Sequence, residues 1–130
     1  MSAAKPTVAI LGASTDRKKY GNKSVRAHVQ QGYDVFPVNP TAAEVEGLKA
    51  YARLADIPAE RLDRISVYLP PQLGITVLDQ IAAKHPQEVW FNPGSESPEL
   101  IEKAEALGLP VIMACSIVDL GSRPSDLSDQ

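Results

Sequence analysis

Short apolar runs and longer amphipathic stretches alternate along the whole chain. Residues 7–12 read Thr-Val-Ala-Ile-Leu-Gly, a continuous apolar run ended by glycine, which is typical of a strand buried on both faces of a parallel sheet. Four further runs of this kind predict strands, at residues 34–40, 65–69, 88–92 and 111–114. Pro37 lies inside the second strand, which indicates that no neighbouring strand needs an amide at that position.

Amphipathic stretches between these strands predict three helices. The first covers residues 23–31, with Asn22 or Ser24 as its N-cap and Gly32 at a left-handed C-cap position. The second covers residues 72–84, and the third begins after Ser97, a residue type that caps helices well. The less regular stretch between the second and third strands is expected to hold a short strand at 49–51 and a loop or short helix at 55–58.

The order of the elements predicts the fold class. Strands that alternate with helices require right-handed crossovers, which place the strands in a parallel sheet. The sequence therefore predicts an α/β, Rossmann-like three-layer domain with a mostly parallel five-stranded sheet, spanning residues 7–120. Residues 1–6 and the Ser/Asp-rich residues 121–130 are expected to be a flexible N-terminus and a flexible tail.

Composition narrows the class of protein. A content of 44% hydrophobic and 22% charged residues is globular, and a net charge of −3 gives no reason to expect nucleic acid or an anionic membrane as partner. No apolar run approaches the ~20 residues that span a bilayer. Cys115 is the single cysteine and has no internal partner, which fits a reducing cytoplasm. No cluster of His, Cys and Asp has the spacing of metal ligands, so we expect no metal site.

Candidate chemistry lies where the predicted strands end. In an open α/β sheet, ligands bind beyond the carboxyl ends of the strands, at the switch point of the topology. The residues at these ends are small or weakly polar and contain no acid–base pair, so no catalytic residue is assigned. The strand ends are Gly12-Ala13-Ser14, Asn39-Pro40, Tyr68-Leu69-Pro70-Pro71, Asn92-Pro93-Gly94 and Ala114-Cys115-Ser116.

The turn after the first strand is the strongest candidate for a phosphate site. Gly12 permits close approach of a phosphate, Ser14 and backbone amides can bond it, and the following helix N-terminus adds a partial positive charge. A lone glycine turn is equally compatible with a simple strand end. The charge pattern favours the phosphate site, although a solvated charged surface is the alternative. Residues 17–26 contain no acid and five cations, Arg17, Lys18, Lys19, Lys23 and Arg26, of which we single out Arg17, Lys18 and Lys23.

Parts of the dinucleotide-binding fingerprint are missing from this sequence, and their absence argues against NAD as the ligand. NAD-binding turns read G-x-G-x-x-G and carry an acid about 20 residues later. Here the second and third glycines are absent after Gly12, and the second strand ends in Asn39-Pro40 without an acid. Cations without a ribose-binding carboxylate suit a ligand with an extra ribose phosphate, and both NADP and coenzyme A carry one.

Taken together, these motifs resemble the CoA-binding domain family, the Rossmann-type module at the N-terminus of the succinyl-CoA synthetase alpha subunit. The resembling motifs are Gly-Ala-Ser at 12–14, Pro-Val-Asn-Pro at 37–40 and Leu-Ala-Asp-Ile-Pro at 54–58, and the likeness covers residues 5 to about 118. The resemblance implies coenzyme A or an acyl-CoA as the ligand.

The resemblance also implies a role for each strand end. Gly12, Ala13 and Ser14 would hold the pyrophosphate, and Asn39 with Pro40 would lie along the adenosine. Two ends depart from the pattern of many members, at Leu69-Pro70 and at Ala114-Cys115-Ser116. Tyr68 and Pro70 lie in a Pro-rich strand end that would border the cofactor, and Asn92, Pro93 and Gly94 would lie near the pantetheine path.

The resemblance finally bears on activity. The synthetases add a domain with a phosphorylated histidine and a nucleotide-grasping domain, and neither is found in these 130 residues. We therefore expect a non-catalytic module whose partner is a small nucleotide ligand, and a homodimer or a partner protein is left open. The alternative is a small NADP-dependent or CoA-dependent enzyme that uses Tyr20 or Cys115.

Overall fold

A computed structural model describes residues 5–130 of the chain. The flexible N-terminus predicted at residues 1–6 therefore falls mainly outside the described residues. Among the described helices, none has the length and apolar character that a membrane crossing requires.

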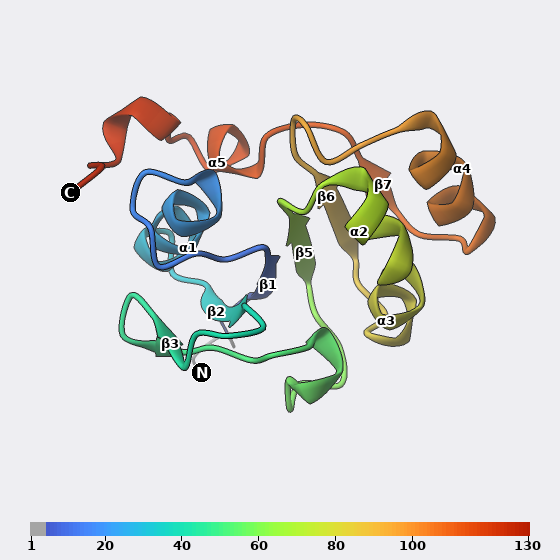
Figure 1. Cartoon of the computed structure of the whole chain (residues 1–130), viewed down its shortest axis with the longest axis horizontal. Coiled ribbons are helices and arrows are strands. Elements are labelled where there is room, and N and C mark those ends of the chain that lie inside the picture. Colours follow the sequence, from blue (N-terminus) through green and yellow to red (C-terminus); the bar gives the residue numbers. More distant parts are fainter. Residues whose placement is uncertain (1–4) are drawn as a thin grey trace.

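Five parallel strands form the central sheet, in the order β2-β1-β5-β6-β7 (Figure 1). Each neighbouring pair is parallel, which confirms the predicted five-stranded sheet. The chain places β2 on one side of β1 and β5 on the other, so the switch point of the topology lies between β1 and β5. The strands are β1 (Thr7–Leu11), β2 (Asp34–Val38), β5 (Arg64–Val67), β6 (Glu88–Phe91) and β7 (Val111–Ile112).

Helices cover both faces of this sheet. Because side chains alternate along β1, Ala9 and Leu11 face a core shared with α3 and α4, whereas Val8 and Ile10 face a core shared with α1. This arrangement confirms the predicted Rossmann-like three-layer domain. The helices are α1 (Tyr20–Gln30), α2 (Pro71–Thr76), α3 (Leu78–Ala83), α4 (Pro98–Ala106) and α5 (Ser116–Asp119), with the 3₁₀ turns η1 (Leu54–Asp56) and η2 (Pro124–Asp126).

The irregular segment after β2 contains a small hairpin beside the sheet. Strands β3 (Glu44–Val45) and β4 (Leu48–Lys49) pair in antiparallel register. Shortly afterwards Tyr51 bridges to Val38 in parallel register and extends the pairing at the outer side of β2. The short strand predicted at 49–51 overlaps the observed strand β4 only at Lys49, and Tyr51 contributes an isolated bridge.

Two helix predictions were wrong in their bounds. Helix α1 begins at Tyr20 rather than at residue 23, and its N-cap residue Lys19 makes no side-chain cap bond. The candidate cap Asn22 lies inside the helix and donates instead to the carbonyl of Ser14, 2.9 Å away. The helix predicted over 72–84 is interrupted at Val77, where three successive β-branched residues (75–77) lower helix propensity.

Other local signals were read correctly. Gly32 has a φ of +85°, as the predicted left-handed cap requires. The hydroxyl of Ser97 accepts the amide of Leu100 at 3.1 Å and caps α4.

The C-terminal segment, residues 121–130, packs against α1. Leu127 is 6% exposed and lies in a small apolar cluster with Ala27 and Ile117. Figure 1 shows this segment in red, beside α1 and α5. The prediction that the segment is flexible stays a prediction, but its contacts place it on the same face as α1.

Candidate functional site

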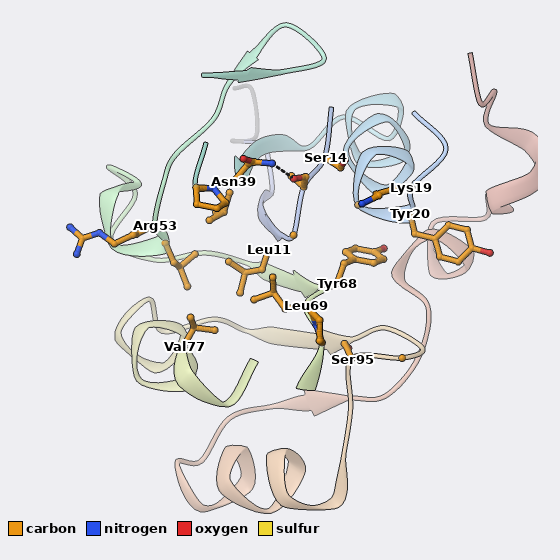
Figure 2. A pocket seen from close by; sticks show the side chains of 18 of the residues that line it. Leu11, Ser14, Lys19, Tyr20, Asn39, Arg53, Tyr68, Leu69, Val77 and Ser95 are labelled. Carbon is orange, nitrogen blue, oxygen red and sulfur yellow. Dashed lines mark hydrogen bonds between the residues drawn. The ribbon is translucent and has the colours of Figure 1, made fainter. Parts of the chain in front are cut away.

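A cleft of about 620 Å³ lies at the carboxyl edge of the sheet and is called the switch-point cleft below (Figure 2). It spans the ends of β1, β2, β5 and β6, including the gap between β1 and β5 where the topology predicts a ligand. Its walls are residues 11–14, 38–40, 68–70 and 93–95, completed by residues 19–21, 52–54, Val77 and Gln80.

Two glycines bring the turn after β1 and the start of α1 together. Gly12 has a φ of +87°, and a Cβ there would lie 3.1–3.2 Å from atoms of Tyr68. A Cβ on Gly21 would lie 2.1 Å from the carbonyl oxygen of Gly12. Gly21 therefore serves close helix–loop packing, the role of the third glycine in the dinucleotide fingerprint, at a longer spacing. The sequence analysis missed this residue because it looked for the standard spacing.

Two asparagine side chains fix the turn after β1 by donating hydrogen bonds to its carbonyls. Asn39 Nδ2 donates to the carbonyl of Ala13 and Asn22 Nδ2 to that of Ser14, each at 2.9 Å. The amides of Ala13 and Ser14 donate to no acceptor within residues 5–130. A turn with its carbonyls occupied and its amides available, beside a helix N-terminus, has the polarity of an anion site.

The switch-point cleft carries a cation at each end and is apolar in its middle. In Figure 2, Lys19 and Tyr20 lie at one end and Arg53 at the other, with Leu11 and Leu69 between them. Lys19 is exposed and is the cation of the predicted basic segment that lines the cleft. The cleft can therefore place an anionic group and an apolar group of one extended ligand.

Tyr68 forms part of the inner wall. Its hydroxyl lies 3.1 Å from Ser116 Oγ, and burial raises the pKa of the phenol, an effect that the bond to Ser116 partly offsets. Tyr68 thus stays a neutral phenol at physiological pH and is a hydrogen-bonding group rather than a base. The described residues that line the cleft include no carboxylate and no imidazole.

The structure brings nine of the predicted contacts together at this cleft. Because these residues come from four different strand ends, their convergence follows from the parallel order of the strands. They are Gly12, Ala13, Ser14, Asn39, Pro40, Tyr68, Pro70, Pro93 and Gly94.

The other four predicted contacts do not line the cleft. Arg17 Nε lies 3.3 Å from Glu46 Oε2, and Lys18 is exposed outside the cleft. Lys23 is 6% exposed and its Nζ lies 2.7 Å from Asp129 Oδ1. Proximity in sequence to the phosphate turn placed these cations near the site, but the side chains of Arg17 and Lys23 reach partners elsewhere.

Asn92, the fourth predicted contact that does not line the cleft, is buried and hydrogen-bonded inside the protein. It is 1% exposed, and its amide donates to Ser66 Oγ at 2.8 Å and to the carbonyl of Val67 at 2.9 Å. Its Oδ1 accepts the amide of Ser116 at 2.8 Å. The side chain therefore joins β5, β6 and the start of α5 from inside the protein.

The candidates Tyr20 and Cys115 have different positions. Tyr20 lines the cleft and is 56% exposed, whereas Cys115 is half-buried and packs with the apolar cluster around Ile117. Within residues 5–130, no group of three or more His, Cys, Asp or Glu side chains is arranged to hold a metal ion.

The profile of one protein family, described as a CoA binding domain, matches residues 6–121. The chain belongs to the CoA-binding domain family. The family resemblance drawn from the sequence motifs is thereby confirmed, over almost the same residues.

The chain is similar in sequence to part of a ligase subunit and to most of a bacterial protein of similar length. The chain is 30% identical over 118 residues to the alpha subunit of acetate–CoA ligase [ADP-forming] II of Pyrococcus furiosus, covering 81% of this chain and 25% of that subunit. It is 26% identical over 106 residues to the uncharacterized protein YneT of Bacillus subtilis, covering 82% of this chain and 78% of YneT. The chain thus spans about a quarter of the ligase subunit and most of the length of YneT.

Solved structures agree with this relationship. A conserved hypothetical protein of Pyrococcus furiosus superposes with a TM-score of 0.78 at 31% identity, covering 89% of this chain and 99% of that one. The acetyl-coenzyme A synthetase 1 of Ca. Korarchaeum cryptofilum superposes with a TM-score of 0.69 at 28% identity, covering 83% of this chain and 26% of that one.

Proposed function

We propose that this protein binds coenzyme A or an acyl-CoA in the switch-point cleft. The observation that carries the proposal is the turn after β1, whose carbonyls are held by Asn39 and Asn22 while the amides of Ala13 and Ser14 are available to an anion. Membership in the CoA-binding domain family supports the same ligand.

The polarity of the cleft fits this ligand along its length. The diphosphate would bind at the turn and at Lys19, where positive charge and available amides coincide. The adenosine would lie along Asn39 and Pro40, and the apolar middle around Leu69 suits the flexible pantetheine arm. A volume of about 620 Å³ lies within the usual range of small-ligand sites, about 300–1,000 Å³.

The proposed role is a binding module rather than an enzyme. General acid–base chemistry is most often carried by a histidine or a carboxylate, and the described lining contains neither; its titratable side chains are Lys19, Arg53 and the phenols of Tyr20 and Tyr68. The catalytic activity in the name of the Pyrococcus ligase subunit belongs to a protein about four times as long.

Thermal shift with four ligands tests the proposal. At about 100 times its dissociation constant a ligand stabilises by about 2.7 kcal/mol. We expect this stabilisation with CoA, a smaller one with dephospho-CoA, and none with NAD. Equal stabilisation by CoA, dephospho-CoA, NAD and NADP would identify a generic anion site, and no response to CoA would contradict the proposal.

A matched pair of lysine variants locates the ligand. Lys18 and Lys19 are adjacent and both exposed, but only Lys19 lines the switch-point cleft. Titration calorimetry should show that Lys19→Gln weakens CoA binding by about tenfold, the loss expected for one charge-assisted hydrogen bond. Lys18→Gln should bind like the unmodified protein. A larger effect at Lys18 than at Lys19 would place the phosphates elsewhere.

A further inference from the structure

The C-terminal segment covers most of the basic segment that follows the phosphate turn. Lys23 Nζ lies 2.7 Å from Asp129 Oδ1, and Arg26 Nη2 donates to the carbonyl of Ser128 at 2.7 Å. Arg17 Nη1 donates to the backbone oxygen of Gln130. Three cations that the sequence places beside a phosphate site thus each contact an oxygen atom of the C-terminal segment.

This contact is packed as well as charged. Leu127 is 6% exposed and anchors the segment in the apolar cluster with Ala27. The carbonyl of Pro124 accepts a second bond from Lys23 Nζ at 3.2 Å. The segment therefore presents Asp129 to the cations from a defined position.

The cations form an electrostatic cluster. Burial and the neighbouring Arg17 lower the pKa of the Arg26 guanidinium, whereas Glu46 and Asp129 act in the opposite direction. The bond to Lys23 and its charge lower the pKa of the Asp129 carboxyl, and Lys18 and Arg26 add to this effect. Two carboxylates thus offset several mutually repelling cations, so a further or replacement anion is electrostatically favoured there.

One cation of the cluster, Lys23, lines a cavity that adjoins the switch-point cleft. A second cavity of about 570 Å³ lies between α1 and the C-terminal segment, and Tyr20 lines both it and the switch-point cleft. Lys23 and Asp129 line the second cavity. In Figure 2 the ring of Tyr20 lies at the Lys19 end of the cleft, on the side of the C-terminal segment. An anionic group that extends past Tyr20 would meet Lys23, the member of the cation cluster that lines the second cavity.

We propose that Arg17, Lys23 and Arg26 form a second anion site, which the C-terminal segment occupies through Asp129 in competition with a phosphomonoester of the ligand in the cleft. The inference rests on the proposed function for the identity of that ligand. When the phosphomonoester binds, it replaces the Asp129 carboxylate on Lys23 and the C-terminal segment leaves α1. The segment is then an internal competitor that lowers affinity for ligands that carry this phosphomonoester.

Two aspartates of the same segment provide a matched test. Asp129 contacts Lys23, whereas Asp126 pairs with Arg123 at 3.1 Å on the surface. Calorimetry should show that Asp129→Asn tightens CoA binding by about two- to fivefold, the range expected on losing a partly exposed competing ion pair. It should leave the affinity for dephospho-CoA, which lacks the phosphomonoester, unchanged. Asp126→Asn should match the unmodified protein with both ligands.

Hydrogen exchange of the C-terminal segment provides the second readout. Saturating CoA should speed exchange of the amides in residues 124–130 of the full chain. Unchanged or weaker CoA binding by Asp129→Asn, or slower exchange with CoA, would overturn the inference, and slower exchange would mean that the segment closes over the ligand.

Failure of the proposed function gives a different pattern. If CoA does not bind the unmodified protein, inorganic pyrophosphate is compared with sodium chloride at equal ionic strength. Faster exchange of residues 124–130 with pyrophosphate alone supports the second anion site, and equal exchange in both salts overturns it.

Discussion

A buried histidine on α1 shows how environment sets the chemistry of a single residue. His28 is fully buried, and its Nδ1 lies 2.8 Å from the carbonyl of Ser24, so Nδ1 carries the hydrogen. Its Nε2 lies 3.5 Å from Arg64 Nη1, and its ring packs edge-on against Tyr33. Burial, with the charge of Arg64, lowers the pKa of His28 to about 4 from an ordinary value of 6.5, although the bond to Ser24 acts in the opposite direction.

Stability should therefore depend on pH through His28. Because the unfolded chain binds a proton near pH 6.5 and the folded protein only near pH 4, the stabilisation is present above pH 6.5 and is lost as the pH falls toward 4. We expect a loss of about 2–3 kcal/mol over this window, measured by urea unfolding. His28→Gln should be less stable at pH 7 but should have a flatter profile between pH 6.5 and 4. An unchanged slope in this variant would assign the pH dependence to other groups.

At the scale of elements, the approach of α1 to the turn after β1 is the contact that builds the anion site. It requires Gly21, since any side chain there would meet the backbone of Gly12. Gly74 is also a helical glycine, in α2, and it also lies close to a neighbouring residue. A Cβ added at Gly74 would lie 2.8 Å from Cδ1 of Leu100, which is the end of a side chain that can rotate away.

The two glycines should therefore respond differently to alanine. Gly21→Ala should lower stability by about 1–3 kcal/mol because the helix must move away from the loop, and it should weaken CoA binding by shifting the amides. Gly74→Ala should cost less in stability and leave CoA affinity unchanged. Thermal unfolding and calorimetry on both variants test this. Unaltered CoA affinity in Gly21→Ala would show that ligand binding does not depend on this helix–loop contact.

For the whole molecule, the interior polar network around Asn92 joins strands to the C-terminal part of the chain. Its amide and carbonyl connect β5 and β6 to the start of α5, and Ser66 Oγ and Ser116 Oγ lie 2.7 Å apart within the same network. The position of α5 therefore depends on a hydrogen-bonded core as well as on apolar packing.

Replacement of Asn92 separates a structural role from a ligand-binding role. Asn92→Asp keeps the size of the side chain but removes its donors and buries a carboxylate beside the carbonyl of Val67. We expect a loss of about 2–4 kcal/mol in urea unfolding, with CoA affinity of the folded protein unchanged. A loss of CoA affinity at normal stability would instead restore Asn92 as a ligand contact.

Local patterns were sufficient for the architecture. Continuous apolar runs predicted strands buried on both faces, and a strand of that kind requires helices on both sides of a parallel sheet. Glycines after a strand or a helix, such as Gly12 and Gly32, marked left-handed backbone, and Ser97 marked a helix start. These signals could be read because the apolar pattern of a strand and the residue types that favour turns and caps are properties of the local sequence. Parallel order then brought the strand ends, and nine predicted contacts, to one cleft.

The hydrogen-bond and ion-pair partners of long polar side chains could not be predicted from the local sequence. Lys23 pairs with Asp129, Arg17 with Glu46, and Asn92 with Ser116, all across more than 20 residues of chain. A flexible cation can reach several acceptors, and which acceptor lies within reach depends on how distant segments pack around it. Lys19 lines the cleft, whereas Lys23 pairs with Asp129. Only the packing of the C-terminal segment on α1 shows this difference between the two lysines.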